Sequence, residues 1–440
     1  MKTLIINAVI LTMNDSFDLF NKGYLAVRGE NIEAVGPMEQ CPDMESFDEV
    51  VDAEGGILVP GFVNTHTHIG MVPFRGLGED MVGRLNRFLI PLEKKQMTQF
   101  LAKASAKYAI AEMQLSGITS FFDMYYFEER LAETCVEMGE RAVLAETVIE
   151  STIDSYKPYG GIELAEEFIG RWKGKSSLVT PSIAPHAPYS NTEESLRKSR
   201  EIADRFDVPY MIHLAEMDFE VSAIREKYDM TPVEYLDSIG FLGENLTAAH
   251  CIFINSRDAE ILGKHNVKVA HCVVANTKSA KGISPVRLMQ ENNVCVGLGT
   301  DGPSSGNTLD MFTVMKATAL AQKTFLRDRS AYTSREILKM ATIDGARALG
   351  LQKIAGSLEP GKKADLTLVE TKSINMYPLY DPYAALVYQA GSHNVETVYV
   401  NGNRIVENKN LLRYSVKEIK DELEKESLSF RYEALKMQNK

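Results

Sequence analysis

Residues 59–68 read VPGFVNTHTH, a short apolar run that ends in the histidines His66 and His68. The apolar residues predict a β-strand over Ile57–Val63, with the two histidines just beyond its carboxyl end. Side chains two positions apart on extended chain point to the same side, so both imidazoles can reach one metal ion. Zinc binds neutral imidazole nitrogens together with a carboxylate oxygen, and a catalytic zinc keeps one position open for water. Taken alone, however, such a pair is more often two ordinary polar loop histidines.

An alternation of short apolar runs and longer helical segments continues from residue 59 to about residue 358. Eight strands are predicted, at Ile57–Val63, Ile118–Asp123, Ala142–Glu146, Leu178–Ala184, Tyr210–Leu214, Leu246–His250, Lys268–His271 and Val294–Gly299. Helices are predicted between most of them, for example at Lys95–Gln114, Glu128–Gly139, Gly161–Trp172, Glu193–Phe206 and Arg257–His265. Eight strands in βα alternation predict an α/β fold with a (β/α)₈ TIM-like barrel, whose active sites lie at the carboxyl ends of the strands.

Both ends of the chain are rich in β-type runs instead. Strands are predicted at Leu4–Leu11, Tyr24–Arg28, Ile32–Val35 and Glu49–Asp52, and again at Ala364–Val369, Val395–Asn401 and Asn403–Val406. Two such segments flanking a barrel can pair into one small β-sandwich. The predicted domains are therefore a sandwich of residues 1–58 and 359–415, a catalytic barrel of residues 59–358, and a charged C-terminal helix over 416–440.

Composition limits the classes of protein that fit. The chain has 440 residues, 45% hydrophobic and 25% charged, with a formal net charge of −12, which is ordinary for a soluble globular protein. This acidity argues against a nucleic-acid surface, which needs a basic stripe. No apolar run approaches the length of a membrane helix, and Asn7 interrupts the apolar N-terminus in a way that argues against a signal peptide. Five scattered cysteines favour a reducing, cytoplasmic setting.

Further chemistry-bearing residues lie at the ends of other predicted strands. His213 comes at a strand end with Glu216 three residues later, His250 ends the next strand, and Asp301 follows the last one. A carboxylate beside a metal can take a proton from water and deliver one to a leaving group. Glu216 alone could equally be a surface residue at a helix start, and Asp301 alone a helix cap. Strand ends carrying His-x-His, His-x-x-Glu, His and Asp in this order nevertheless favour a metal site.

Two more histidines end strands. His186 could bind either the metal or the substrate, and His271 is interpreted as structural.

The residues at 59–68 resemble the opening signature of the amidohydrolase superfamily. More narrowly, the chain resembles the branch that contains methylthioadenosine/S-adenosylhomocysteine deaminases, other aminoheterocycle deaminases and triazine hydrolases. The similarity runs from about residue 3 to residue 420 and includes GSLEPGKKADL at 356–366, which resembles the family's return into its β-sandwich.

The resemblance implies a mononuclear metal site. His66, His68, His213 and Asp301 would hold one Zn²⁺ per subunit, with Fe²⁺ as the alternative. Family members with two metals usually bridge them with a carboxylated lysine after the fourth strand, where this chain has His186.

The resemblance also implies catalytic roles for three residues. Glu216 would move the proton from water to the leaving amine, His250 would polarise the attacked centre or orient the nucleophile, and Asp301 would help to activate the water. The reaction would be hydrolytic deamination, with ammonia released.

Substrate contacts are implied as well. His186 matches the position that contacts the base in adenosine-type deaminases, and Glu93 matches the carboxylate that grips the ribose hydroxyls, although a solvated helix glutamate is the alternative for Glu93. Both matches favour an adenosine-type nucleoside such as 5′-methylthioadenosine. S-adenosylhomocysteine is less favoured, because Glu146 aligns where its deaminases place an arginine.

Other departures from the family pattern leave residues without a role. Arg84 and Arg87 replace an often aromatic stretch and could bind an anionic group or simply face solvent. The segment HCVVAN at 271–276 differs from the usual His-Cys-Pro-x-Ser-Asn, which leaves the exact substrate open.

Two further hypotheses remain. One is hydrolysis of another aminoheterocycle, such as guanine, a pterin or a triazine. The other is a non-catalytic scaffold that has lost its metal, which predicts missing ligands, and none is missing. The expected partner is a small molecule, without nucleic acid or membrane. Similar proteins usually form homo-oligomers, although the sequence marks no interface.

Overall fold

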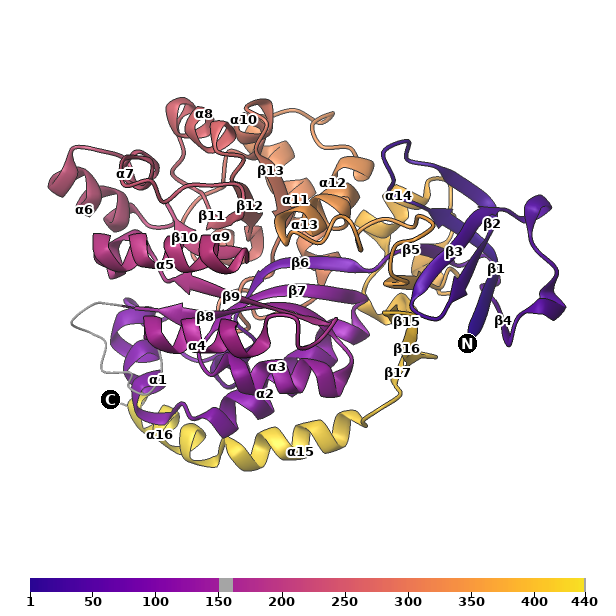
Figure 1. The fold of residues 1–440 in the computed structure, drawn as a ribbon, viewed down its shortest axis with the longest axis horizontal. Coiled ribbons are helices and arrows are strands. Elements are labelled where there is room, and N and C mark those ends of the chain that lie inside the picture. The colour runs from indigo at the N-terminus through magenta and orange to yellow at the C-terminus, as the bar shows by residue number, and fades with distance from the viewer. Residues whose placement is uncertain (150–160, 439–440) are drawn as a thin grey trace.

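The computed structural model describes residues 1–149 and 161–438. Its centre is a sheet of eight parallel strands, hydrogen-bonded in chain order from β6 to β13 (Figure 1). These strands are β6 (Phe62–Thr67), β7 (Ile118–Tyr125), β8 (Arg141–Val148), β9 (Val179–Pro185), β10 (Tyr210–Leu214), β11 (Leu246–His250), β12 (Lys268–His271) and β13 (Cys295–Leu298). The backbone amide of Asp301, just after β13, donates to the carbonyl of His66 on β6 at 3.0 Å and brings the sheet round towards closure. The predicted α/β barrel is confirmed.

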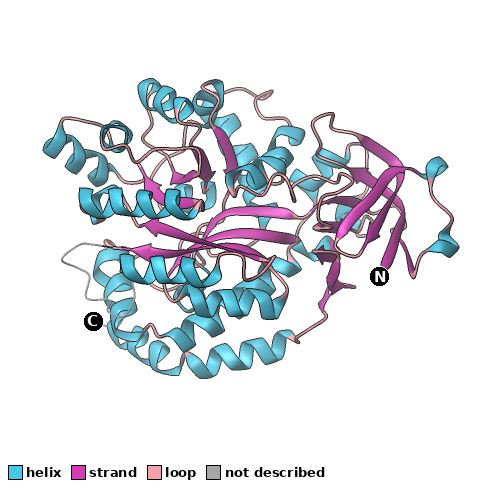
Figure 2. Cartoon of the chain, in the orientation of Figure 1, coloured by secondary structure: helices cyan, strands magenta, loops and turns pink. Residues whose placement is uncertain are grey.

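Helices surround the barrel strands (Figure 2). They are α1 (Ile90–Gln96), α2 (Gln99–Leu115), α3 (Glu128–Met138), α4 (Ile162–Trp172), α5 (Glu193–Phe206), α6 (Asp218–Tyr228), α7 (Pro232–Ser238), α8 (Ser256–Lys264), α9 (Val273–Lys278), α10 (Val286–Glu291), α11 (Met311–Leu326), α12 (Ser334–Met340) and α13 (Ile343–Ala348). Every residue of β6, β7, β8, β10 and β11 is buried. Burial on both faces is typical of parallel strands covered by helices, and it explains why these strands appear in the sequence as continuous apolar runs.

A second sheet beside the barrel combines both ends of the chain. Its strands are β1 (Lys2–Leu11), β2 (Leu19–Arg28), β3 (Asn31–Pro37), β4 (Glu49–Asp52), β5 (Ile57–Pro60), β14 (Leu366–Val369), β15 (Val395–Val400), β16 (Asn403–Glu407) and β17 (Asn410–Leu411). They lie in the order β17-β16-β15-β14-β5-β1-β2-β3, with β4 also paired to β1. The β-rich unit that the two chain ends were predicted to form as a small sandwich is therefore present as a nine-stranded sheet, while the domain boundaries given above stay a prediction.

The single strand predicted over Ile57–Val63 is wrong in one respect. The chain forms two strands there, because it leaves the second sheet at β5, turns at Gly61 and enters the barrel as β6. A Cβ atom at Gly61 would lie 2.1 Å from the side chain of Thr119 on β7, so only glycine fits this passage. As a result, the strand that carries His66 is joined directly to the second sheet.

Two helix predictions also need correction. The helix expected at Lys95–Gln114 is interrupted, because Thr98 is extended and its side chain accepts a hydrogen bond from the amide of Leu101 to start α2. The C-terminal helix is two helices, α15 (Val416–Glu426) and α16 (Leu428–Gln438), which divide at Ser427. Figure 1 shows them running below the barrel towards α1, where Glu433 pairs with Lys95 at 2.6 Å.

A buried ion pair ties the barrel to the second sheet. Arg141, the first residue of β8, donates from Nε to the Oδ2 atom of Asp365 at 2.6 Å, and the two side chains are 2% and 1% exposed. A second guanidinium nitrogen reaches Asp365 Oδ1 at 3.2 Å and Asn401 Oδ1 at 3.1 Å. Removing one member would leave the other charge buried without a partner.

We therefore expect Arg141→Met to lower the free energy of unfolding by about 3–5 kcal/mol. Urea unfolding followed by circular dichroism measures this change. The matched control is Arg171→Met, because the ion pair of Arg171 with Glu129 lies at the surface and should contribute at most about 1 kcal/mol. Equal effects of the two substitutions would show that the buried pair does not hold the sheets together.

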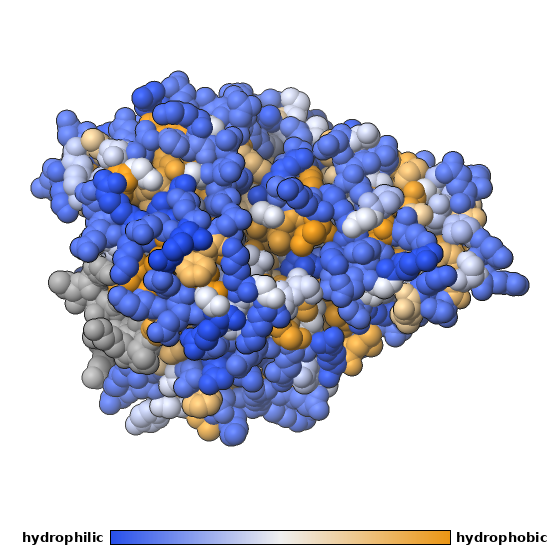
Figure 3. All heavy atoms as spheres, in the orientation of Figure 1, coloured by the Kyte–Doolittle hydropathy of each residue, from blue (hydrophilic) through white to orange (hydrophobic). Residues whose placement is uncertain are grey.

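The face shown in Figure 3 is mostly hydrophilic, with hydrophobic residues scattered over it. Within residues 1–149 and 161–438, no helix combines the length and apolar character needed to cross a bilayer.

Candidate active site

Three histidines from two strands meet at the carboxyl end of the barrel. His66 belongs to β6, His68 follows it, and His213 belongs to β10; their nearest ring nitrogens all lie within 4.8 Å of one another. Asp301 faces the same point, with Oδ1 3.4 Å from the Nε2 atom of His68 and 3.9 Å from that of His66. His66 and His68 lie two positions apart at the end of β6, and His213 and Asp301 join them because parallel strands share one carboxyl edge.

Hydrogen bonds to the Nδ1 atoms of His68 and His213 fix both rings with their Nε2 atoms facing the cluster. His68 Nδ1 lies 2.6 Å from the carbonyl oxygen of Met124, and His213 Nδ1 lies 2.8 Å from that of His186. A carbonyl only accepts, so each Nδ1 carries the hydrogen and each Nε2 presents a lone pair. The Nε2 atom of His66 is buried without any hydrogen-bond partner in the described part of the chain. Three imidazole nitrogens and one carboxylate oxygen are a donor set that fits zinc.

Burial keeps these rings in the form that binds metal. It lowers the pKa of His66 and of His213 well below the ordinary histidine value, and the neighbouring histidines lower both further. The rings of His66 and His213 are therefore neutral at pH 7, as a metal ligand must be.

The backbone at the strand ends is strained. His250 and Asp301 are in the left-handed region, with φ of 74° and 58°. Non-glycine residues hold this conformation at a cost of about 1–3 kcal/mol and only where surrounding contacts enforce it, as they commonly do at functional sites. Here the backbone amide of Thr300 donates to Asn64 Oδ1 at 3.0 Å, and the Thr300 hydroxyl donates to the carbonyl of Asp301 at 2.8 Å.

Glu216 and His250 form a second group beside the histidine cluster. Glu216 Oε1 lies 3.6 Å from His250 Nε2, and the His250 ring stacks on that of His213 with centroids 5.4 Å apart. Burial alone would raise the pKa of Glu216, but the charges of His250 and Lys281 hold it well below the usual range. The carboxylate is thus ionised and placed to accept a proton.

Neighbouring side chains orient this pair. His250 Nδ1 lies 2.8 Å from Oδ1 of Asn276, in α9. The backbone amides of Ala215 and Glu216 donate to the buried carboxylate of Glu220 at 2.8 and 3.0 Å.

The residues expected to contact substrate lie next to the cluster. The rings of His186 and His213 meet edge to face with centroids 4.9 Å apart, and His186 Nδ1 lies 2.8 Å from the hydroxyl of Ser190. Glu93 is only 8% exposed and accepts a 2.6 Å hydrogen bond from the hydroxyl of Tyr125, so it is not the solvated helix glutamate that was the alternative. Burial raises the pKa of Glu93.

In the structure, Glu146 caps a helix. Both carboxylate oxygens accept hydrogen bonds from the backbone amides of Phe127 and Glu128, at the start of α3. The side chain is committed to that helix end, so its charge is not directed at a ligand as the argument against S-adenosylhomocysteine assumed.

Arg84 is likewise committed to the protein, because it donates to the carbonyls of Leu77 and Ser304 at 2.7 and 2.8 Å. Arg87 lies exposed nearby. His271 is buried and its pKa falls to about 3 because of that burial, which agrees with a structural residue.

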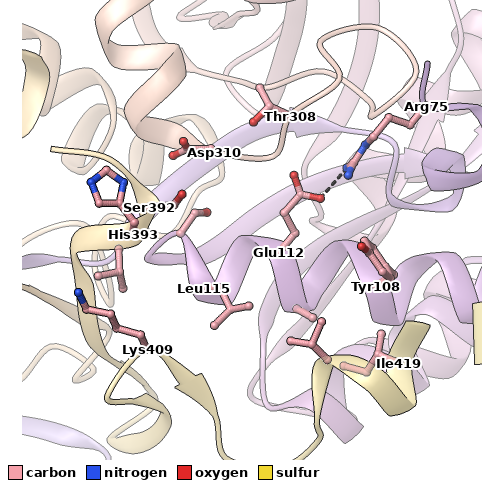
Figure 4. Close-up of a pocket in the computed structure, with 14 residues that line it drawn as sticks. Arg75, Tyr108, Glu112, Leu115, Thr308, Asp310, Ser392, His393, Lys409 and Ile419 are labelled. Atoms are coloured by element: carbon pink, nitrogen blue, oxygen red, sulfur yellow. Dashed lines mark hydrogen bonds and ion pairs between the residues drawn. The ribbon is translucent and has the colours of Figure 1, made fainter. Parts of the chain in front are cut away.

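A separate cavity of about 470 Å³ lies between α2, α15 and the loops at 308–310 and 392–395 (Figure 4). Its lining includes the ion pair of Arg75 with Glu112, joined at 2.5 Å, together with Asp310, His393 and Lys409. None of the histidines of the cluster lines it. We therefore do not assign the catalytic chemistry to this cavity.

Sequence reasoning missed Lys281, whose Nζ lies 2.5 Å from Glu216 Oε1. The residue sits in a polar turn far from Glu216 in sequence, where nothing marks it as part of a site.

The fold and the site together define the class of protein: a β/α barrel that carries, at its carboxyl face, a histidine group suited to a metal. The particular family follows from comparison: residues 57–405 match the model of the Amidohydrolase family, and the chain belongs to that family.

Curated relatives match nearly the whole chain. The 5-methylthioadenosine/S-adenosylhomocysteine deaminase of Syntrophobacter fumaroxidans is 37% identical over 419 residues, 94% of this chain and 95% of the relative. The 5′-deoxyadenosine deaminase of Methanobrevibacter smithii is 37% identical over 422 residues, with the same coverage of 94% and 95%.

Solved structures match as well. An adenosine deaminase from Xanthomonas campestris with bound zinc superposes with a TM-score of 0.92 at 28% identity, covering 98% of each chain. The atrazine chlorohydrolase of Arthrobacter aurescens, complexed with zinc, has a TM-score of 0.89 at 21% identity, covering 96% of this chain and 99% of its own, and shows the shared fold.

Proposed function

We propose that the chain is a metal-dependent hydrolytic deaminase of an adenosine-type nucleoside, with 5′-methylthioadenosine as the leading substrate. The observation that carries this proposal is the grouping of Glu216, His250 and His186 around the histidine cluster of a chain 37% identical to nucleoside deaminases. Deaminases need a nucleophile, a proton carrier and a base-binding side chain at one point.

His66, His68, His213 and Asp301 would hold the metal, one zinc ion per subunit, with Fe²⁺ as the alternative. The chemistry that a bound zinc ion supplies is Lewis-acid activation of a water molecule near neutral pH.

The chain's own residues would handle the proton. In the proposed reaction, a water oxygen bonds to the ring carbon, the bond from that carbon to the amino nitrogen breaks, and ammonia leaves. Glu216 accepts a proton from the attacking water and delivers one to the departing amino group, as its ionised carboxylate allows. His250, 3.6 Å from Glu216, orients the nucleophile, and its ring is fixed by Asn276. Asp301 shares in activating the water.

The ring and sugar would be held by His186 and Glu93. A buried carboxylate that already accepts one hydroxyl hydrogen bond, from Tyr125, retains capacity to accept from ribose hydroxyls. We place the enzyme in the cytoplasm, acting on a small molecule, from its scattered cysteines and acidic composition.

Ammonia release from metal-quantified protein tests the proposal. The panel would contain 5′-methylthioadenosine, 5′-deoxyadenosine, adenosine, S-adenosylhomocysteine, guanine, a pterin and an aminotriazine. We expect turnover of the adenosine-type nucleosides and none of the last three. Turnover of guanine, the pterin or the aminotriazine without turnover of the nucleosides would mean that the substrate is another aminoheterocycle. Ammonia from none of them, with metal bound, would reject the substrate class.

Glu93→Gln should lower kcat/KM for 5′-methylthioadenosine by about 10- to 100-fold, because hydrogen bonds to a charged acceptor typically contribute about 1.5–3 kcal/mol. The same variant should change kcat/KM little for the 2′,3′-dideoxy analogue, which lacks the hydroxyls. Steady-state kinetics on both substrates measure the difference. An equal loss on both would remove Glu93 from ribose recognition.

A further inference from the structure

Lys281 places an ammonium group inside the proposed active site. Its Nζ lies 2.5 Å from Oε1 of Glu216, and the two side chains are only 18% and 15% exposed. No second hydrogen bond from this ammonium occurs within residues 1–149 and 161–438. An atom that hydrogen-bonds Glu216 must therefore come close to a largely desolvated cation.

The turn that carries Lys281 fixes the direction of the side chain. The amide of Lys281 donates to the carbonyl of Asn276 at 3.0 Å, which folds the chain back after α9. Ala280 is left-handed with φ of 53°, and Gly282 has φ of 126°. The hydroxyl of Ser284 then donates to the carbonyl of Cys251 at 2.8 Å, which ties the turn to the end of β11. The lysine is thus held over the carboxyl face of the barrel rather than on a free loop.

Burying an ammonium is costly unless its donors are used. A lysine has three N–H donors, and Glu216 takes one of them. If Glu216 is to exchange protons with the substrate ring, that ring must lie within hydrogen-bond reach of Glu216 and therefore close to the remaining donors of Lys281. A ring atom there is favoured if it accepts a hydrogen bond and disfavoured if it donates one.

Adenine has hydrogen-bond acceptors where the ammonium of Lys281 requires them. The ring nitrogens N1, N3 and N7 are all unprotonated acceptors, so one can engage Glu216 while another accepts from an ammonium. In guanine the carbon that bears the amino group has an N–H donor on one side, which an ammonium would oppose.

We propose that Lys281 is a specificity-determining residue that donates a hydrogen bond to an unprotonated ring nitrogen of the purine, beside the nitrogen served by Glu216. This proposal rests on the proposed deamination of adenosine-type nucleosides and names the part of the base that the site recognises.

The test crosses the Lys281→Met variant with substrates that lack one ring nitrogen. The substrates are 5′-methylthioadenosine and its 7-deaza and 3-deaza analogues, in which a C–H replaces the nitrogen. The altered ring changes the intrinsic reactivity of each analogue. For wild type, we expect kcat/KM for one of the two analogues to fall by about 10- to 100-fold more than this change explains, as for the loss of a hydrogen bond to a charged group. For Lys281→Met, the parent should fall by a similar factor, and that same analogue should lose no more. Because the cycle compares ratios, electronic differences between the rings cancel.

The matched control is Lys278→Met. Lys278 lies three residues earlier, but its Nζ donates to the carbonyl of Ser305 and pairs with Glu79 instead of Glu216. This variant should discriminate among the three substrates as wild type does. Lys281→Arg, which keeps a cation, should retain part of the discrimination. Metal content and circular dichroism show that each variant is folded.

Two kinetic outcomes would overturn the inference while the proposed function stands. Equal loss of kcat/KM for the parent and both analogues in Lys281→Met would mean that Lys281 only positions Glu216. Faster turnover in Lys281→Met would mean that the lysine obstructs the substrate. No ammonia from 5′-methylthioadenosine with metal-loaded wild type would overturn the proposed function and this inference together.

Discussion

Glu216→Gln is expected to lower kcat by about 10²- to 10⁴-fold while metal content stays at the wild-type level. This is the range that a positioned general acid–base contributes, and a glutamine amide can neither accept nor deliver the proton. The geometry supports a large effect, since Glu216 Oε1 is 3.6 Å from His250 Nε2 and, within residues 1–149 and 161–438, no other carboxylate pairs with that nitrogen. Steady-state kinetics with metal analysis on the same sample measure both quantities.

The neighbouring Asp218→Asn is the control, because this exposed residue at the start of α6 removes the same charge without touching the cluster. Glu216→Gln also removes the charge partner of Lys281, so thermal unfolding has to be compared with wild type. Glu216→Asp keeps the charge but withdraws the carboxylate by one methylene, and a displacement of this size can lower the rate by about 10²-fold. A fully active Glu216→Gln enzyme would assign the proton transfer to another group.

Removal of the metal is the second large effect. His213→Ala should lose both bound metal and at least about 10³-fold in kcat/KM, because Lewis-acid activation contributes several kcal/mol and each 1.36 kcal/mol is tenfold in rate. A chelator should inactivate wild type, and about one equivalent of zinc per chain should restore activity. His393→Asn, in an exposed loop, is the control and should keep both metal and activity. Activity without metal would reject the proposed role of the cluster.

The sequence predicts the barrel and the cluster well for a common physical reason. Parallel strands are buried on both faces, so they appear as continuous apolar runs, and their carboxyl ends converge. His66, His213, His250 and Asp301 could therefore be placed together without knowing any distance, since each lies at such an end.

Features that depend on three-dimensional contact could not be found in this way. The break at Gly61 depends on the closeness of Thr119, more than fifty residues away along the chain. The capping of α3 by Glu146 depends on the closeness of the end of β8 to Phe127 and Glu128, almost twenty residues earlier in the chain. The approach of Lys281 to Glu216 depends on a turn whose polar residues resemble any surface loop.

The strand order of the second sheet has a consequence for biosynthesis. β5 has β1 on one side and β14 on the other, with Ile57 opposite Val9 and also opposite Val369. A ribosome releases the chain from the N-terminus, so the edge of β5 stays unpaired until residues 366–369 have emerged. Since β5 continues through Gly61 into the strand of His66, the nascent barrel remains attached to an open sheet edge for most of translation. Maturation of the metal-binding strand is thus tied to a segment that is made only after the whole barrel.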